Sequence, residues 1–434
     1  MRPALMSPDS TEFVILSFEG PDRYSLAGGL GTRVTELALA LASQGYRTHL
    51  FFVGDPDLPG EEVLEGGRLI YHRWCQWLSR MYPGGVYDGE EDKLRDFGHS
   101  VPSYVTREIV APAAAEGRVV AVLAEEWQTA DATSTLSDFL HAAGLRRDAI
   151  LFWNANNIFG FDRINWGRLG YTATLTTVSR YMKHYMWRLG INPLVIPNGI
   201  PARLLGPVNN DLAAQVRRLY AEALLLFKIG RFDPDKRWMM AVEAAARLKE
   251  RGARVAFPLR GGVEPHGRDV LAYAYSRGLR VVDVTSADRT PAGGLAAMAA
   301  AIGQGDIYNL RFFVPEELTR ALFAAAQAVL ANSGHEPFGL VGLEAMAAGG
   351  LVFTGASGED YASSMSNCVV VETDDPEEIC ANVLYLRDHP ALIDRMRVAA
   401  RETAARFTWE EVIANLISKL EYVGQTSGVL ATGG

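Results

Sequence analysis

Two glutamates eight positions apart, Glu336 and Glu344, are the residues whose types and spacing most directly indicate chemistry in this chain. They follow the apolar run Ala328–Ala331 and a polar turn, and alanine-rich sequence with helical spacing comes next, which predicts a strand, a turn and a helix. The N–H groups of residues 338–341 would then be unpaired donors that suit a phosphate. The two carboxylates and this helix end could together hold a sugar, a diphosphate and a ribose. An ordinary turn with surface glutamates is the alternative.

Two cations, Arg231 and Lys236, follow a second apolar run, Leu224–Ile229, which predicts a buried strand. A guanidinium gives forked hydrogen bonds and an ammonium gives a compact point charge, and a diphosphate needs both. Gly230 would leave room for a ligand at the strand end. The alternative is a pair of surface cations that serve solubility.

A glycine-containing loop lies between the predicted strand 13–17 and the predicted helix 32–44, and a strand at 46–53 follows. This order is a βαβ unit, which implies a parallel sheet wound with helices. Gly29 and Gly31 would let a ligand approach the backbone closely, although such loops also occur merely as tight turns. The loop lacks the third glycine of a dinucleotide-binding fingerprint.

Further polar residues stand at predicted strand ends. The strand 119–124 ends at Glu125, and the strand 150–153 is followed by Asn156. Because ligands of open parallel sheets bind beyond the carboxyl ends of the strands, both are candidates for a site. The aromatic-rich segment 71–104 is predicted to be irregular, either as a substrate-facing loop or as a capping helix pair.

Composition and charge narrow the class of protein. The chain has 434 residues, 48% of them hydrophobic, and a formal net charge of −9, which argues against a general nucleic-acid binder. Its three cysteines are widely spaced and are expected to be reduced thiols in a cytoplasmic protein, and no signal peptide or membrane span is predicted. The eight histidines show no metal-cage spacing. A helix at 180–189 mixes bases with aromatics, so it either packs on one face or lies on the inner surface of a membrane.

The alternation of strands and helices continues through the second half of the chain. We therefore expect an α/β protein of two doubly wound Rossmann-like domains that face a central cleft. A turn and an aperiodic segment place the boundary between residues 1–205 and residues 206–408. An amphipathic helix is predicted at 409–423.

Five stretches carry a resemblance to a known family: residues 28–34, 177–181, 196–200, 230–236 and 336–346. Taken in this order, each at a predicted strand end, they resemble the retaining GT-B glycosyltransferases of family 4, with glycogen and starch synthases as more distant relatives. The similarity runs from residue 13 to about residue 423. It implies that the final helix crosses back onto the N-terminal, acceptor-side domain, and that residues 206–408 bind the nucleotide-sugar donor.

The resemblance also implies roles for the candidate residues. Arg231 and Lys236 would bind the donor diphosphate and neutralise it as the nucleotide leaves. Glu336 would contact the hydroxyls of the donor sugar, and Glu344 would accept hydrogen bonds from the ribose. The donor would also meet the N–H groups of three residues, Phe338, Gly339 and Leu340. Gly29 and Gly31 would approach the diphosphate and the acceptor from the other domain, and the family generally needs no metal or other cofactor.

The sequence departs from the family pattern on the acceptor side. Glu125 and Gln128 stand where the synthases have histidines, and Asn156 replaces another histidine. Either Glu125 and Asn156 take over the hydrogen bonding of the usual histidine, or His99 does. This departure casts more doubt on glucan synthase activity than on glycosyl transfer.

We therefore predict a hexosyltransferase that moves glucose from UDP-glucose to a hydroxyl acceptor, a saccharide or a lipid-linked saccharide, with retention and without a metal. GDP-mannose or ADP-glucose as donor is the nearest alternative. A nucleotide-sugar-binding protein without catalysis and an epimerase on the same scaffold are further alternatives.

Overall fold

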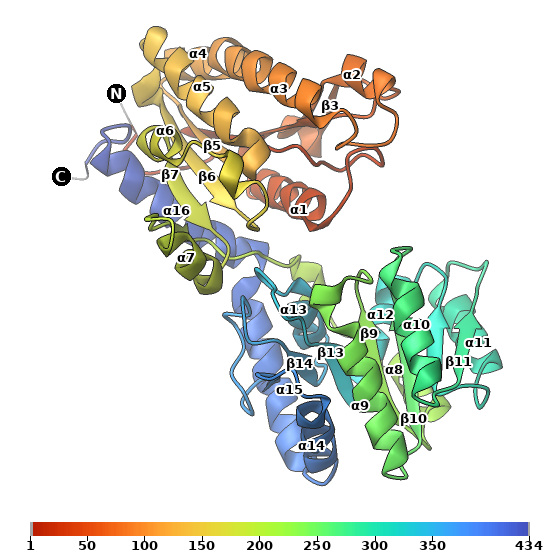
Figure 1. The fold of residues 1–434 in the computed structure, drawn as a ribbon. Coiled ribbons are helices and arrows are strands. Elements are labelled where there is room, and N and C mark those ends of the chain that lie inside the picture. Colours follow the sequence, from red (N-terminus) through yellow and green to blue (C-terminus); the bar gives the residue numbers. More distant parts are fainter. Residues whose placement is uncertain (1–2, 433–434) are drawn as a thin grey trace. The chain divides into compact units, whose positions relative to one another are not determined.

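The computed structural model describes residues 3–432 and divides into two compact units. The N-terminal unit contains the chain up to residue 201 together with the segment from residue 409 onward, and the C-terminal unit contains residues 202–408. The last helix of the chain thus belongs to the first unit, beside elements that lie hundreds of positions earlier in the sequence (Figure 1).

The N-terminal unit is built on an eight-stranded sheet with the order β3-β4-β2-β1-β5-β6-β7-β8. All neighbours are parallel except β3 and β4. Strands β1 and β5 are buried along their whole length, as expected for the centre of a parallel sheet. The strands are β1 (Thr11–Leu16), β2 (Arg47–Val53), β3 (Glu61–Leu64), β4 (Leu69–Trp74), β5 (Val119–Glu125), β6 (Ala149–Ala155), β7 (Thr174–Thr177) and β8 (Leu194–Val195).

Eight α-helices accompany this sheet in the described part of the unit. They are α1 (Gly29–Ser43), α2 (Gln76–Met81), α3 (Glu90–Tyr104), α4 (Ala111–Ala115), α5 (Ala130–Ala142), α6 (Trp166–Thr172), α7 (Arg180–Trp187) and α16 (Trp409–Thr426), and a π-helical turn, Val105–Val110, joins α3 to α4. In α16 the buried residues recur at helical spacing, from Trp409 through Val412, Ile413 and Leu416 to Leu420. This face packs into the same core as Phe13 of β1, so the helix completes the N-terminal unit.

Two sequence predictions in this unit are corrected. The segment 71–104 is not irregular, because it contains the end of β4 and the helices α2 and α3, so the structure shows the helix pair of the two predicted alternatives. Helix α3 forms because Lys93, Phe97 and Val101 share one buried face, which packs against α5. Helix α1 begins at Gly29, three residues before the predicted start, so the glycines form its first turn.

The C-terminal unit is built on a seven-stranded parallel sheet with the order β11-β12-β10-β9-β13-β14-β15. Its strands are β9 (Leu224–Ile229), β10 (Val255–Arg260), β11 (Val281–Val284), β12 (Ile307–Leu310), β13 (Ala328–Ala331), β14 (Val352–Thr354) and β15 (Val369–Val370). Its α-helices are α8 (Asn210–Leu219), α9 (Trp238–Glu250), α10 (His266–Ser276), α11 (Pro291–Ala300), α12 (Glu316–Ala325), α13 (Leu340–Ala347), α14 (Pro376–Arg387) and α15 (Pro390–Ala404). Trp238 at the start of α9 is fully buried in the core of this unit with Phe257 and Phe353.

Both units are doubly wound α/β domains, as the sequence predicted. In each sheet the strand order reverses once near the centre, between β1 and β5 in the first and between β9 and β13 in the second. At such a point the loops that leave two adjacent strands diverge and open a crevice for a ligand. The topology therefore selects the loops after these four strands as the places to look for chemistry.

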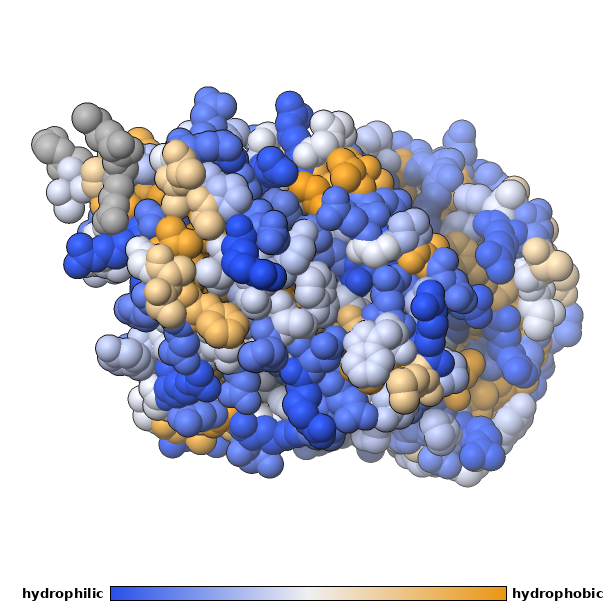
Figure 2. Space-filling model, turned by 90° about the horizontal axis from the view of Figure 1, so that it is seen from above, coloured by the Kyte–Doolittle hydropathy of each residue, from blue (hydrophilic) through white to orange (hydrophobic). Residues whose placement is uncertain are grey.

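The surface is mixed in character. On the face in Figure 2, apolar residues form separate groups between polar ones and no continuous apolar area. Within residues 3–432, no helix combines the length and the apolar character needed to cross a bilayer. All three cysteines are buried and unbridged.

Candidate functional site

The loops after β9 and β13 bring Lys236 and Glu336 together. Residues 234–236 form a short 3₁₀ turn, which begins where the Asp233 carboxylate accepts the N–H of Asp235 at 2.9 Å. From this turn the Lys236 ammonium donates to the Glu336 carboxylate and forms an ion pair with it. Both side chains remain partly exposed, at 26% and 19%. A charged pair that solvent can reach, at the switch point of a sheet, is well placed to meet a charged ligand.

Helix α13 begins beside this pair, after a glycine that no other residue could replace without strain. Gly339 has a φ of +37°, and a Cβ atom there would lie 2.7 Å from the Cγ of Glu359. The first turn of α13 contains no acidic residue. The first N–H groups of any α-helix lack partners within the helix, and the macrodipole favours an anion beside them. The end of α13 therefore suits a phosphate group.

The loop after β14 holds the backbone of Glu336 through hydrogen bonds. The Ser357 hydroxyl accepts the N–H of Glu336 at 2.9 Å, and the N–H of Gly358 donates to the Glu336 carbonyl at 2.8 Å. Glu359 in the same loop is buried, and one of its carboxyl oxygens accepts the N–H of Ser357 at 3.1 Å. The other oxygen, Oε1, is buried and has no hydrogen-bond partner among residues 3–432. Burial, reinforced by the charge of Glu336, raises the pKa of Glu359 to about 7.

A buried lysine fixes the end of β13. Lys228 of β9 donates to the carbonyl of Leu330 at 2.9 Å and to the side-chain oxygen of Asn332 at 2.7 Å. Its pKa is held well below the usual value by burial and by the nearby charge of Lys236. Lys228 thus ties β9 to β13, the two strands from which Lys236 and Glu336 are presented.

The other predicted donor-side residues lie on the same loops and on α13. Arg231 is exposed, and its carbonyl accepts the indole N–H of Trp238 at 2.7 Å. Glu344 is partly exposed on α13. The Phe338 side chain is buried against Tyr361, so the side chain itself is not available to a ligand. Leu340 is the first residue of α13.

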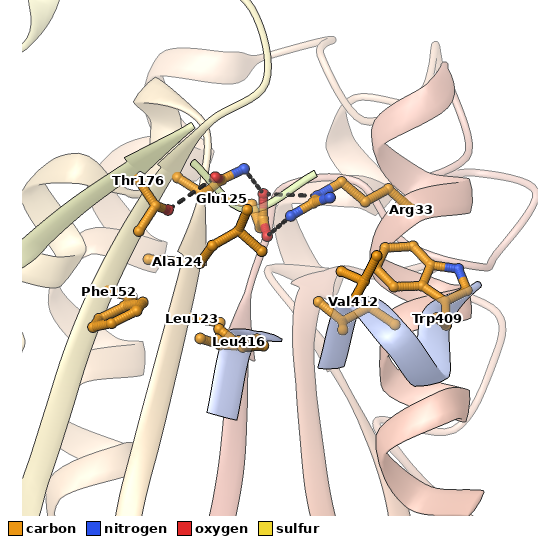
Figure 3. Close-up of a pocket in the computed structure, with 12 residues that line it drawn as sticks. Arg33, Leu123, Ala124, Glu125, Phe152, Thr176, Trp409, Val412 and Leu416 are labelled. Carbon is orange, nitrogen blue, oxygen red and sulfur yellow. Dashed lines mark hydrogen bonds and ion pairs between the residues drawn. The ribbon is translucent and has the colours of Figure 1, made fainter. Parts of the chain in front are cut away.

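In the N-terminal unit, Glu125 at the end of β5 is the centre of a buried polar network (Figure 3). Its two oxygens lie 3.2 Å from the Arg33 guanidinium of α1. The Asn154 and Asn156 side chains donate to Glu125 Oε2 at 2.9 and 2.7 Å. Figure 3 also shows the Arg33 side chain beside Trp409, the first residue of α16. Both oxygens of Glu125 are therefore engaged in hydrogen bonds. Glu125 is buried, whereas Asn156 is partly exposed.

Glu126, the next residue, combines a strained backbone with a buried carboxyl group. Its φ is +69°, a conformation that non-glycine residues rarely adopt and that is often found at functional sites. Its side chain accepts the N–H of Asn156 at 2.7 Å. Burial raises its pKa to about 8, and the adjacent charge of Glu125 contributes to the rise.

His99 lies apart from this network. It is exposed on α3, where its ring packs edge-on against Phe139 of α5 at 6.0 Å. It lines an open groove with Trp77 and Met81. The structure thus brings Glu125 and Asn156 into direct contact and places His99 elsewhere.

The N-terminus of α1 is occupied by a side chain of the same unit. Glu19 Oε2 accepts the N–H of Gly28 at 2.8 Å and the N–H of Gly31 at 3.0 Å. The Tyr87 hydroxyl donates to the other oxygen of Glu19 at 2.6 Å. At Gly29, in contrast, an added Cβ would meet no atom within 4 Å from the described residues beyond its chain neighbours and the backbone of its own helix. A ligand could reach the backbone at Gly29, whereas the N–H of Gly31 is already in use.

The sequence did not predict Glu19, Tyr87, Glu126 or Glu359 as site residues. Glu19 and Glu359 follow β1 and β14, so the strand-end argument that selected Glu125 applies equally to them. The position of Tyr87 carries no such signal, because the segment before α3 is predicted only as irregular. Among residues 3–432, no group of three or more His, Cys, Asp or Glu side chains is arranged to hold a metal ion.

Comparison with known sequences links the C-terminal unit to one family. Residues 210–403 match the family model of the group 1 glycosyl transferases. Over 246 residues the chain is 27% identical to the D-inositol 3-phosphate glycosyltransferase of Thermomonospora curvata. The matched region covers 55% of this chain and 53% of that protein. The chain spans about half the length of the curated relatives it matches.

Comparison with solved structures covers both units. Sucrose-phosphate synthase from Thermosynechococcus elongatus matches with a TM-score of 0.64 at 19% identity, over 94% of this chain and 99% of the other. HepE from Anabaena, solved in complex with UDP-glucose, matches with a TM-score of 0.60 at 16% identity, over 95% of this chain and 99% of the other. The two Rossmann-like domains thus have the GT-B fold, which confirms the predicted fold class.

Proposed function

We propose that this chain, whose C-terminal unit is a group 1 glycosyl transferase domain, moves a hexose from a nucleotide sugar to a hydroxyl acceptor with retention. The observation that carries the proposal is the ion pair of Lys236 and Glu336 beside the N-terminus of α13. A nucleotide sugar combines a diphosphate, which needs cations and N–H donors, with a polyhydroxyl ring, which needs a carboxylate. This corner of the C-terminal unit supplies all three.

The pair implies an order of events in donor binding. Lys236 and Glu336 neutralise each other in the free protein. When the diphosphate arrives, the ammonium turns from Glu336 to a phosphate oxygen, and the released carboxylate accepts hydroxyls of the sugar. Arg231, which is exposed on the same loop, joins the diphosphate with a forked hydrogen bond. Glu344 accepts hydrogen bonds from the ribose.

Bond cleavage in this proposal uses the leaving group itself as the base. As the bond from the sugar to the phosphate breaks, negative charge grows on the diphosphate, and Lys236, Arg231 and the end of α13 stabilise it. The acceptor hydroxyl attacks from the same face and gives its proton to the departing phosphate oxygen. No nucleophile from the protein and no metal ion are then required.

The acceptor side of the reaction falls to the N-terminal unit. In this proposal Glu125 has a positioning role. Its ion pair with Arg33 fixes the carboxylate, and the carboxylate in turn accepts a hydrogen bond from the Asn156 side chain and orients it. The Asn156 amide can then offer hydrogen bonds at the end of β6, in the position where related enzymes have a histidine.

UDP-glucose is the donor we propose, with GDP-mannose and ADP-glucose as the alternatives. HepE, solved with UDP-glucose, shares the fold of this chain over nearly its whole length, and so does a starch synthase solved with ADP, so the donor assay below decides among the three. The same reaction class would serve the other two donors, since Lys236, Arg231, Glu336 and Glu344 are assigned to the diphosphate, the sugar and the ribose and none of them to the base.

The experiment is an assay of nucleotide release and product formation with each of the three donors and with glucose, maltose and myo-inositol as acceptors. Lys236→Ala and Glu336→Ala should each lower the rate by about 100-fold or more, the usual cost of removing a group that stabilises the transition state. The matched controls are Arg254→Ala and Glu222→Ala, which break an exposed ion pair of the same unit and should keep full activity. Unchanged turnover in the Lys236 and Glu336 variants would contradict the proposal.

A donor-binding protein without catalysis is the second candidate, and the observation that favours it is the saturated Glu125 in place of a histidine. Calorimetry separates the two functions. Tight binding of UDP-glucose with neither transfer nor hydrolysis would support the silent protein, and turnover would exclude it.

A further inference from the structure

We propose that the acceptor is a neutral polyhydroxyl compound, an unphosphorylated sugar or polyol, and that Glu19 and Tyr87 bind its hydroxyls while Glu19 excludes phosphorylated acceptors. This inference rests on the proposed transferase function and adds the chemical class of the second substrate. It concerns the loop after β1 and the N-terminus of α1, both within the N-terminal unit.

The first observation is that the anion position at the start of α1 is already filled. Helix α1 spans 15 residues and has no acidic residue in its first turn, so its N–H groups would attract a phosphate. Glu19 takes that place, because one of its oxygens accepts the N–H groups of both Gly28 and Gly31. A phosphorylated acceptor would have to displace a carboxylate that is only 5% exposed.

The loop that holds Glu19 is firmly anchored. Asp22 accepts the Arg73 guanidinium at 2.9 Å and the N–H of Asp55 at 3.0 Å, and both Asp22 and Arg73 are buried. The Ser25 hydroxyl donates to the carbonyl of Val53. These contacts tie the loop to the end of β2 and to β4, so the backbone that presents Glu19 is held in place by a buried ion pair.

The surroundings of Glu19 are negative. Burial raises the pKa of Tyr87, and the carboxylates of Glu19 and Glu90 raise it further. Lys93, the buried cation of this region, offers no charge to a ligand. It is fully enclosed, and its ammonium donates to the Tyr24 hydroxyl at 2.8 Å and to nearby carbonyl groups, those of Gly85, Val86 and Asp88.

The same groups suit hydroxyls. A carboxylate oxygen can accept more than one hydrogen bond, so Glu19 Oε1 can accept a ligand hydroxyl in addition to that of Tyr87. The Tyr87 hydroxyl can itself accept a hydrogen bond, and the residue is 41% exposed although its hydroxyl reaches inward to Glu19. A sugar could therefore donate to Glu19 and Tyr87 and pack on the exposed part of the tyrosine.

The relatives make this contrast informative. The matching protein of Thermomonospora curvata is a D-inositol 3-phosphate glycosyltransferase, so its name describes a phosphorylated acceptor. If Glu19 sets the acceptor class, this chain differs from that relative in the charge of its acceptor and agrees with it in the type of reaction.

The first test compares matched acceptors with UDP-glucose as donor: glucose with glucose 6-phosphate, and myo-inositol with D-inositol 3-phosphate. The wild type should favour the neutral member of each pair by about tenfold or more in kcat/KM, because juxtaposed like charges are strongly unfavourable. Glu19→Ala should reduce or reverse this preference. If Glu19→Ala does not fold, Glu19→Gln keeps an oxygen for the two N–H groups and should still reduce it. A wild type that prefers the phosphorylated member would overturn the proposal.

The second test does not depend on the donor or on turnover. Inorganic phosphate is titrated into the protein by calorimetry with the donor site saturated by UDP. The wild type and Tyr87→Phe, which keeps Glu19 in place, should show no saturable binding, and Glu19→Ala should gain a site at the vacated N–H groups. Equal phosphate binding by the wild type and Glu19→Ala would overturn the proposal. Absence of transfer to every acceptor, with the expected phosphate result, would instead contradict the proposed enzymatic function alone.

Discussion

The two units have the same architecture but differ in the charged side chains at one helix start. Each is a parallel sheet whose order reverses once, and each places the start of a helix beside the reversal. At α13 in the C-terminal unit, Lys236 lies near the start of the helix, where it pairs with Glu336 and its charge also acts on the buried Glu359. At α1 in the N-terminal unit, a carboxylate occupies the helix end itself. One helix end is thus prepared for an anion, and the other is closed to it.

The difference shows that a glycine-rich helix start is not by itself a phosphate site. The glycines of α1 allow a close approach to the backbone, and the protein uses that approach for its own Glu19. The charge of the side chain in the loop after the preceding strand, Glu19 after β1, determines whether such a helix start can bind a phosphate. This difference in charge fits the proposal that the C-terminal unit binds the donor and the N-terminal unit binds the acceptor.

The units also share a feature, which gives the largest expected effect. Each holds a buried carboxyl group with a raised pKa near its switch point, Glu126 at about 8 and Glu359 at about 7. Because the folded state holds these protons more tightly than the unfolded state, the stability that they contribute is complete below pH 4.5 and is lost as pH rises through the folded pKa. For Glu359 the loss between pH 4.5 and 7 amounts to roughly 3 kcal/mol at about 1.4 kcal/mol per pH unit. Glu359→Gln and Glu126→Gln should therefore gain stability relative to the wild type between pH 5 and pH 8.5.

Urea denaturation at these two pH values measures the gain. A constant difference between wild type and variant at both values would show that the carboxyl group is not protonated in the folded state.

The second prediction concerns UDP binding in the C-terminal unit. Lys236→Ala should weaken UDP binding by about 2 kcal/mol, roughly 30-fold, because a charged hydrogen bond to the diphosphate is lost. Glu336→Gln should have the opposite effect, since it frees Lys236 and removes a negative charge beside the diphosphate. Calorimetry with Arg254→Ala as the matched control measures both, and equal weakening by the two variants would contradict the proposed exchange of partners.

The third prediction tests the start of α13. Gly339→Ala places a Cβ 2.7 Å from Glu359 at a positive φ, so it should destabilise the protein by about 1–3 kcal/mol and weaken UDP binding. The control is Gly98→Ala in the middle of α3, where no atom lies within 4 Å of the new Cβ and a gain of about 0.5–1 kcal/mol is expected. Thermal unfolding measures both changes. Similar melting temperatures for the two variants would show that Gly339 is not constrained.

The smallest effect is expected at the closed helix end. Tyr87→Phe removes one hydrogen bond to Glu19 and should cost about 1 kcal/mol of stability. It should also raise KM for a neutral acceptor several-fold while leaving UDP binding unchanged. A change in UDP affinity would place Tyr87 on the donor side and blur the distinction between the two units.

The sequence predicted the fold class and the order of most elements because long apolar runs and helical spacing recur regularly along the chain. It did not predict β3, whose sequence EEVL lacks a buried face because the strand lies at the exposed edge of the sheet. The order of the strands in a sheet also cannot be predicted from local sequence. That β1 lies beside β5, and β9 beside β13, decides which strand ends meet, and pairings of this kind are long-range contacts.

The same limit applies to the site. Lys236 and Glu336 could each be named from the strand that precedes them, and the structure places them in contact. The role of Glu359 depends on a loop that folds under Glu336, 23 positions earlier in the chain, and the pairing of Glu125 with Arg33 spans 92 positions. Such partners follow from tertiary packing and leave no periodic signal.

The most direct test of the contrast between the two helix ends is a crystal structure of the protein with UDP bound. We expect the diphosphate to lie beside the N-terminus of α13 with Lys236 turned from Glu336 to a phosphate oxygen, while Glu19 still accepts the N–H groups of Gly28 and Gly31. A diphosphate bound to those two N–H groups, with Glu19 displaced and the pair of Lys236 and Glu336 intact, would contradict this expectation.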